Sequence, residues 1–162
     1  LTPDEIDDLL YLSRTNSTAD LSAYLSSLSA AYAVPIDAVV LAAVDPETGN
    51  GLLHYAAANG HLEILTHLHA AIPSATRTLL NRPNARQNTP LHYACLNGQL
   101  GFAQALVAAG ADTRVKNSAG HDAVFEAERS GHDGVVAWLL VEGGALDDVV
   151  GGLRGEEGAA SG

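Results

Sequence analysis

The feature that most constrains the fold of this chain is an internal repeat. Residues 50–60 (NGLLHYAAANG) align without a gap with residues 88–98 (NTPLHYACLNG), at an offset of 38 residues. A third copy follows the second by 33 residues, so that Gly131 corresponds to Gly98. Repeats of roughly 20 to 50 residues build solenoids, because each unit buries its apolar face only by stacking on its neighbours. We therefore predict a solenoid with five additional residues between the first two aligned copies.

The second copy has the features of two short helices joined by a tight turn. The Thr89 hydroxyl can cap the first helix, and Pro90 lies in the first turn, where its missing N–H costs no hydrogen bond. Gly98 can end this helix in the left-handed conformation. A second helix is predicted by apolar residues at helical spacing, namely Leu100, Phe102, Ala103, Leu106 and Val107.

The tetrapeptide TPLH at residues 89–92, followed by Tyr93 and Ala94, resembles the signature of the ankyrin-repeat family, and 33 residues is the repeat length of that family. The resemblance implies an all-α ankyrin-repeat solenoid of about four helix–turn–helix repeats with hairpin loops. The first repeat is degenerate, with capping-box spacing at its start and Asn16 in the place of the terminal Gly. We expect repeats near residues 3–33, 48–70, 86–112 and 119–142.

Three other segments depart from the repeat pattern. Residues 34–48 and 72–86 are longer than a hairpin loop requires, and we expect an extra helical turn or an extended finger in each. Insertions in repeat arrays fall in loops, often on the binding face. Residues 143–162 are rich in Gly and acidic residues and can bury little surface, so we expect a flexible tail.

The net charge of −11 at pH 7 is distributed unevenly along the chain. Residues 1–64 contain nine acidic residues and one Arg, and residues 119–162 contain nine acidic residues and two Arg. Residues 65–118 contain five basic residues and one Asp. Acidic flanks of this kind repel nucleic acid and attract basic partners, although charge that serves only solubility gives the same pattern.

The histidines and the single cysteine, which could in principle serve catalysis or metal binding, occupy positions where a structural role is expected instead. His54 and His92 occupy the signature position, where a histidine bonds to the backbone or to the neighbouring Thr. Cys95, the only cysteine, lies at a small-residue packing position, so a buried thiol is expected rather than a nucleophile. His61, His67 and His69 lack the i, i+4 spacing of a helical zinc site. We therefore expect no enzymatic activity, no metal and no cofactor.

A closer resemblance is carried by residues 91–100 (LHYACLNGQL) and 120–131 (GHDAVFEAERSG). They are similar to the fungal ankyrin-repeat chaperones of a small-subunit ribosomal protein. The resemblance implies a cytoplasmic and nuclear protein that shields a newly made basic ribosomal protein with a KH domain, the third in the small-subunit series. We also expect a monomer, because the repeats need no partner subunit to bury their core. We expect no direct contact with nucleic acid, because the sequence has no basic stripe with interleaved aromatic residues, and none with membrane, because its apolar stretches are too short to span a bilayer. The alternative is a generic ankyrin scaffold or adaptor for a signalling or transcription partner.

Ankyrin geometry also predicts where a partner binds. Exposed positions of the first helices follow the signature His and precede the terminal Gly, which predicts a row formed by Tyr11, Tyr55, Tyr93 and Glu126. In the last repeat, Glu128 is either simply solvated or forms an acidic clamp with Glu126. Together with their neighbours, these positions give the candidate partner-binding residues Tyr11, Tyr55, Asn59, Tyr93, Leu96, Asn97, Asp122, Glu126, Glu128 and Arg129.

Overall fold

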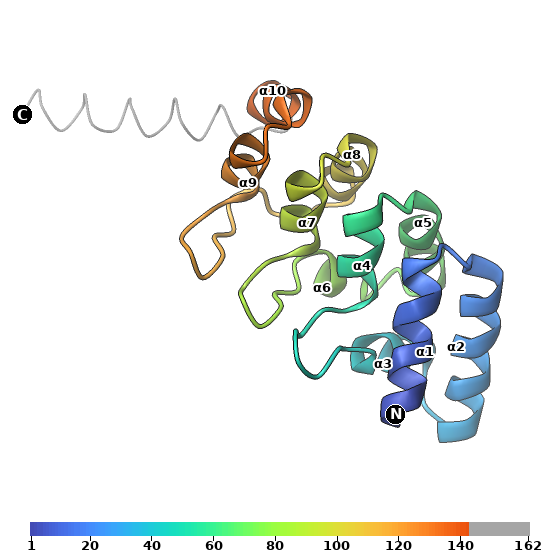
Figure 1. Cartoon of the computed structure of the whole chain (residues 1–162). Helices are drawn as coiled ribbons and strands as arrows, with labels where there is room; N and C mark the ends of the chain where they lie inside the picture. Colours follow the sequence, from blue (N-terminus) through green and yellow to red (C-terminus); the bar gives the residue numbers. More distant parts are fainter. Residues whose placement is uncertain (143–162) are drawn as a thin grey trace, which may run out of the picture.

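The computed structural model describes residues 1–142, which form ten α-helices and, besides them, one isolated bridge between Val44 and Gly51 (Figure 1). The predicted tail at residues 143–162 lies outside the described residues. The all-α prediction is confirmed. The helices are α1 (Pro3–Arg14), α2 (Thr18–Tyr32), α3 (Ile36–Ala42), α4 (Leu52–Asn59), α5 (Leu62–Ala71), α6 (Thr76–Leu80), α7 (Pro90–Leu96), α8 (Leu100–Ala108), α9 (Ala123–Arg129) and α10 (Asp133–Val141).

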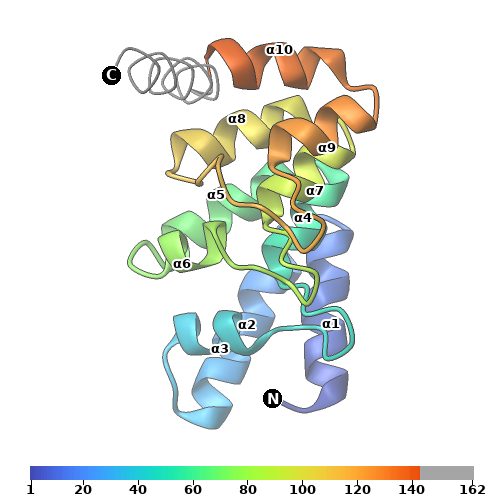
Figure 2. The same ribbon diagram turned by 90° about the vertical axis from the view of Figure 1, so that its left-hand side faces the viewer.

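Eight of these helices form four stacked pairs. The first helices α1, α4, α7 and α9 pack side by side in that order, and α2, α5, α8 and α10 pack behind them. Figure 2 shows the stack running from the N-terminal pair to α9 and α10. The loops before α4, α7 and α9 project to one side of it, the left in Figure 1. The sequence repeats therefore form a solenoid of helix pairs within residues 1–142.

Small side chains set the close packing between first helices. Ala56, Ala94 and Ala127 occupy the same repeat position and are fully buried, as is Cys95 one residue after Ala94. A larger side chain at these positions would separate adjacent repeats, since protein interiors are packed at crystal-like density. The second helices contribute the larger apolar groups that fill the space behind, including Ile64, Leu68, Phe102, Leu106 and Leu139.

The signature histidines join successive repeats. Nδ1 of His54 accepts a hydrogen bond from the Gly51 backbone N–H (3.0 Å), so Nε2 carries the proton and donates to the Asn88 carbonyl of the next hairpin (2.9 Å). His92 repeats this arrangement, with Nδ1 accepting from the Thr89 N–H (3.1 Å) and Nε2 donating to the His121 carbonyl (3.0 Å). Each neutral imidazole thus fixes its own helix start and the loop of the following repeat.

Predicted helix ends are confirmed at several positions. Thr2 and Glu5 form a reciprocal capping box at the start of α1. Asn16 adopts a left-handed conformation with φ of 59°, and Gly98 does so with φ of 70°. Only Gly adopts these angles at little cost, and Asn is the next best tolerated residue.

Gly98 carries a second constraint that Gly131 lacks, although both have a positive φ. A Cβ atom at Gly98 would lie 2.5 Å from Nδ1 of His132, whose Nε2 donates to the Leu96 carbonyl, whereas a Cβ at Gly131 would meet nothing within 4 Å. We expect Gly131→Ala to lower the free energy of unfolding by about 1 kcal/mol through backbone strain. Gly98→Ala should cost about 2 to 3 kcal/mol, because the imidazole must also move.

Urea denaturation of both variants measures this difference. Equal losses for the two variants would mean that the His132 contact contributes nothing to the stacking of the last two helix pairs.

Both predicted insertions contain a short helix, α3 in the first and α6 in the second. They contact each other, because Arg82 after α6 donates from Nη1 to the Leu41 carbonyl of α3 (2.7 Å). Within residues 1–142, no single helix is long and apolar enough to cross a membrane, and α2 with α3 meets that criterion only as a pair bent by 104°.

Candidate protein-binding surface

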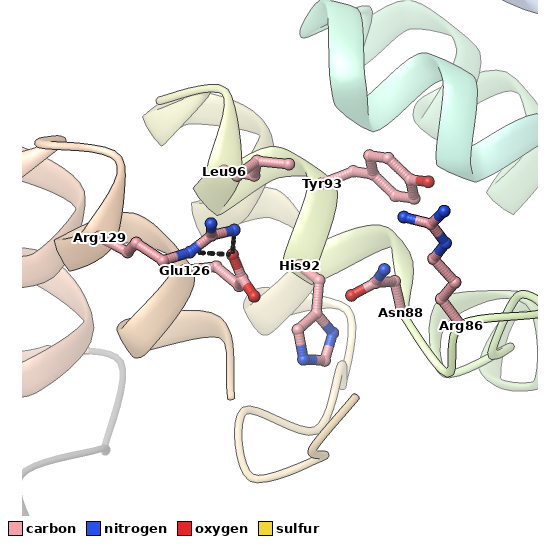
Figure 3. A pocket seen from close by; sticks show the side chains of 7 residues that line it. All are labelled: Arg86, Asn88, His92, Tyr93, Leu96, Glu126 and Arg129. Carbon is pink, nitrogen blue, oxygen red and sulfur yellow. Dashed lines mark hydrogen bonds and ion pairs between the residues drawn. The ribbon is translucent and has the colours of Figure 1, made fainter. Parts of the chain in front are cut away.

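The candidate residues come together most closely between α7 and α9. A pocket of about 190 Å³, here called the α7/α9 pocket, is lined by Arg86, Asn88, His92, Tyr93, Leu96, Glu126 and Arg129. Figure 3 shows Glu126 directed towards Arg129, with Arg86 and Tyr93 on the other side. Four of the residues predicted from sequence, namely Tyr93, Leu96, Glu126 and Arg129, therefore share one pocket.

The prediction that Glu126 is exposed is wrong. Its side chain is buried, because Oε1 accepts hydrogen bonds from Asn117 and His121, both at 3.0 Å, and Oε2 accepts from Nη2 of Arg129 at 2.6 Å. Burial alone would raise the pKa of Glu126, but the hydrogen bonds from Arg129, His121 and Asn117 outweigh it and lower that pKa. The carboxylate therefore anchors the hairpin before α9 and cannot form an acidic clamp with Glu128.

A pair of substitutions separates the roles of these two glutamates. Glu126→Gln removes the charge that three donors share, and we expect it to lower the free energy of unfolding by about 1 to 2 kcal/mol. Glu128→Gln makes the same change of charge on an exposed side chain two residues away and should change stability by less than about 0.5 kcal/mol. Thermal or urea unfolding of both variants tests this, and equal stability of the two would rule out the anchoring role.

The two inner tyrosines of the predicted row are partly built into the scaffold. The Tyr55 hydroxyl donates to Oδ2 of Asp45 (2.8 Å), and the Tyr93 hydroxyl accepts from Nδ2 of Asn84 (3.1 Å). The carboxylate of Asp45 and the amide oxygen of Asn84 also accept backbone N–H groups within their own loops. Each tyrosine hydroxyl therefore holds the loop before its helix against that helix. Their rings nevertheless remain half-exposed, as a binding anchor requires.

Some of the remaining candidates form hydrogen bonds within the fold, and two of these, Asn59 and Asn97, are also exposed. Asp122 caps α9 by accepting the Phe125 N–H (2.9 Å), and Asn97 donates to the Ala58 carbonyl of the preceding repeat (3.0 Å). Asn59 donates to the Tyr55 carbonyl of its own helix (2.8 Å). The side chains that project into solvent are Tyr11, at 60% exposure, together with Asn59, Asn97, Glu128 and Arg129.

The charge of the α7/α9 pocket is opposite to that of the chain as a whole. Glu126 is satisfied within the protein, whereas Arg86 is exposed beside the pocket and Arg129 retains 55% side-chain exposure. A third arginine, Arg14, lies 4.4 Å from the ring centroid of Tyr55. The face formed by the first helices thus presents arginines, which suits acidic or polar groups of a partner better than basic ones.

Sequence reasoning missed one recurring contact. The residues after Gly60, Gly98 and Gly131 donate to carbonyls at the end of the first helix of the preceding repeat: His61 to Arg14 (2.9 Å), Gln99 to Ala58 (3.4 Å) and His132 to Leu96 (2.9 Å). The repeat alignment contained the signal, since these residues occupy one position.

The chemically reactive groups serve packing. Cys95 is fully buried, and burial raises the pKa of its thiol to about 12, which keeps it protonated. Burial lowers the pKa of His54 to about 4, and burial also lowers the pKa of His92. Within residues 1–142, no three His, Cys, Asp or Glu side chains are grouped as metal ligands.

Comparison with known proteins shows the same architecture. Residues 30–117 and 53–149 match the family described as ankyrin repeats (3 copies). The chain is 34% identical over 102 residues to the ankyrin repeat-containing protein YAR1 of Saccharomyces cerevisiae, covering 59% of this chain and 51% of YAR1. It is 36% identical over 101 residues to the nuclear factor NF-kappa-B p105 subunit of Rattus norvegicus, covering 62% of this chain. The chain spans about half the length of YAR1 and 10% of p105.

A solved structure extends this similarity to most of the chain. A chain in the crystal structure of the yeast ribosomal protein Rps3 in complex with its chaperone Yar1 superposes with a TM-score of 0.77 and 30% sequence identity. The match covers 88% of this chain and 95% of that chain.

Proposed function

We propose that this chain, which belongs to the ankyrin-repeat family, is a dedicated chaperone that binds a newly made basic ribosomal protein of the small subunit before ribosome assembly. The observation that carries the proposal is the likeness to a chain of the Rps3–Yar1 complex, which extends over 88% of this chain with 30% sequence identity. The client proposed here is the counterpart of Rps3, the KH-domain protein that is third in the small-subunit series.

The charge of the chain supports this choice of client. A net charge of −11 on 162 residues attracts a basic protein at long range and competes with the RNA to which that protein later binds. Binding during transport requires no catalysis, which agrees with the structural use of Cys95, His54 and His92. We propose that the chain accompanies its client as a monomer through the cytoplasm and into the nucleus, without direct contact to nucleic acid or membrane.

A generic adaptor for a signalling or transcription partner remains the second candidate. The similarity to p105 favours it, but that similarity covers 10% of p105 and rests on the repeats that all members of the family share. The two functions differ in what they predict for a basic client. An adaptor is not expected to prevent the aggregation of Rps3, whereas a chaperone should prevent it at an equimolar ratio.

Light scattering of yeast Rps3 on dilution into low salt tests the proposal. An equimolar amount of this chain should keep Rps3 in solution, and the complex should elute as one species from a gel-filtration column. An unrelated acidic protein of similar size and net charge serves as the control, because general charge neutralisation would act equally in both mixtures. Aggregation of Rps3 to the same extent with this chain as with the control would refute the chaperone function.

A further inference from the structure

The outer end of the first helix pair carries a groove that no candidate residue except Tyr11 predicted. It has a volume of about 320 Å³ and is lined by α1 and α2 alone, through Asp8, Tyr11, Leu12, Asp20 and Tyr24. Tyr11 is 60% exposed, Leu12 and Tyr24 are half-buried, and both aspartates are exposed. We call this surface the N-terminal groove.

The apolar character of the N-terminal groove is unusual for the end of a solenoid. Leu12 lies four residues before Asn16, the left-handed residue that ends the first helix. In the inner repeats the same position is held by Ala56 and Ala94, which are completely buried against the neighbouring repeat. In the first repeat this side faces outward. A terminal repeat needs only a polar outer face to remain in solution, so an outward Leu between two tyrosines indicates a different use.

The last helix pair provides the contrast within the same molecule. Glu128 precedes its left-handed Gly by three positions, at the point where Ala57 and Cys95 face the next repeat in the inner pairs. Here the position is charged and exposed. One end of the described stack is therefore polar at its stacking position, and the other is apolar and aromatic with carboxylates at its rim.

The electrostatic surroundings of the N-terminal groove are acidic. Residues 1–76 contain one Arg and no Lys, and that residue, Arg14, lies over the Tyr55 ring of α4. Burial raises the pKa of the Tyr24 hydroxyl, and the carboxylates of Asp8, Glu5 and Asp4 raise it further. A positively charged group entering the groove thus meets several carboxylates, with no Lys or Arg side chain among residues 1–13 to compete with it.

We infer that the N-terminal groove binds an arginine-bearing segment of the basic client, and this inference rests on the proposed function. A guanidinium stacks on the exposed tyrosine ring while its N–H groups donate to a carboxylate, and the alkyl stem of the side chain covers Leu12. The α7/α9 pocket is the poorer site for the same segment, because Arg86 and Arg129 border it. The client therefore places its positive side chains at the end of the stack rather than along the first helices.

Calorimetric titration of yeast Rps3 into four forms of the chain tests this inference. The double variant Asp8→Asn/Asp20→Asn removes two negative charges at the N-terminal groove. The control Asp133→Asn/Glu142→Gln removes two from exposed side chains at the opposite end, so both variants carry the same net charge. The fourth form, Tyr11→Ala, keeps the charge and removes the exposed ring. All substituted side chains are exposed, and unchanged circular-dichroism melting verifies that the variants are folded.

We expect Asp8→Asn/Asp20→Asn and Tyr11→Ala each to weaken binding about tenfold, and the control to weaken it less than about threefold. Equal weakening by the two charge variants would overturn the inference and leave the proposed function intact, since it would show that only the total charge matters. Absence of binding by the unsubstituted chain would instead overturn the proposed function, and this inference with it.

Discussion

Replacing Phe102 by Ala should lower the free energy of unfolding by about 3 to 5 kcal/mol. Phe102 is 1% exposed and is the largest fully buried side chain among the described residues. It lies in α8, in the third of the four helix pairs, so the cavity would form inside the stack and not at its end. Since a domain of this size is typically stable by about 5 to 15 kcal/mol, this one change removes a large part of the total.

The only other phenylalanine provides a matched control. Phe125 is 43% exposed and contacts the His121 ring at a centroid distance of 4.0 Å. Phe125→Ala removes the same atoms and should cost less than about 1 kcal/mol. Urea denaturation followed by far-UV circular dichroism measures both changes. Similar losses for the two variants would contradict the placement of Phe102 at the centre of the packed interior.

Acid should destabilise the protein in a pH range set by its signature histidines. His54 accepts the Gly51 N–H at Nδ1, so the folded chain holds this imidazole neutral, and burial lowers its pKa from 6.5 to about 4. In the unfolded chain the imidazole titrates near 6.5. The unfolded state therefore binds more protons between these two values, and the stabilisation, complete above pH 6.5, is lost as the pH falls towards 4. For His54 alone the loss amounts to about 3 kcal/mol.

The variant His54→Asn identifies the source of this pH dependence. It is less stable than the unsubstituted chain at pH 7, because it lacks the bond from Nε2 to the Asn88 carbonyl. It cannot titrate, however, and should lose less stability between pH 6.5 and pH 4. His92 contributes in the same direction, since burial lowers its pKa as well. An identical pH slope for His54→Asn and the unsubstituted chain would assign the acid sensitivity to other groups.

The helical stack could be predicted from sequence because its determinants are local and repeat. The left-handed residue at the end of the first helix recurs in all four helix pairs. The Thr-Pro start recurs in two of them, and the small buried residue in three, as Ala56, Ala94 and Ala127. The His54 and His92 bonds follow from the same regularity, as each imidazole spans its own helix start and the next loop. The two insertions lie outside the repeat pattern, so the sequence left open an extra helical turn or an extended finger in each, and the structure has one short helix in each, α3 and α6.

The binding surface could be predicted only in part, because it depends on which positions the fold leaves exposed. Glu126 occupies the position of Tyr93 in the preceding repeat, so the template placed it on the surface. Its burial results from three donors, Asn117, His121 and Arg129, whose convergence on one carboxylate no repeat pattern specifies. The N-terminal groove was missed for a related reason, since a template derived from inner repeats does not describe the outer face of a terminal one.

The location of the charge changes the interpretation of the acidic composition. The sequence left open whether Glu126 and Glu128 of the last repeat form an acidic clamp for a basic partner or whether Glu128 is simply solvated. In the structure, Asp122 caps α9 and Glu126 anchors its hairpin, so neither is available as an unpaired acidic group for a partner. Exposed aspartates with an adjoining apolar and aromatic surface lie instead on α1 and α2. This arrangement separates a site for positive side chains from the arginine-bordered α7/α9 pocket.

Calorimetric titration of yeast Rps3 into the unsubstituted chain at low and at high salt is the most direct test of the central claim. If the chain is a chaperone of this basic client, it should bind one equivalent tightly at low salt. Binding should weaken markedly at high salt, where the Debye length falls to about 3 Å and exposed charges are screened. Failure to bind at either salt concentration, or an affinity that does not respond to salt, would contradict the account.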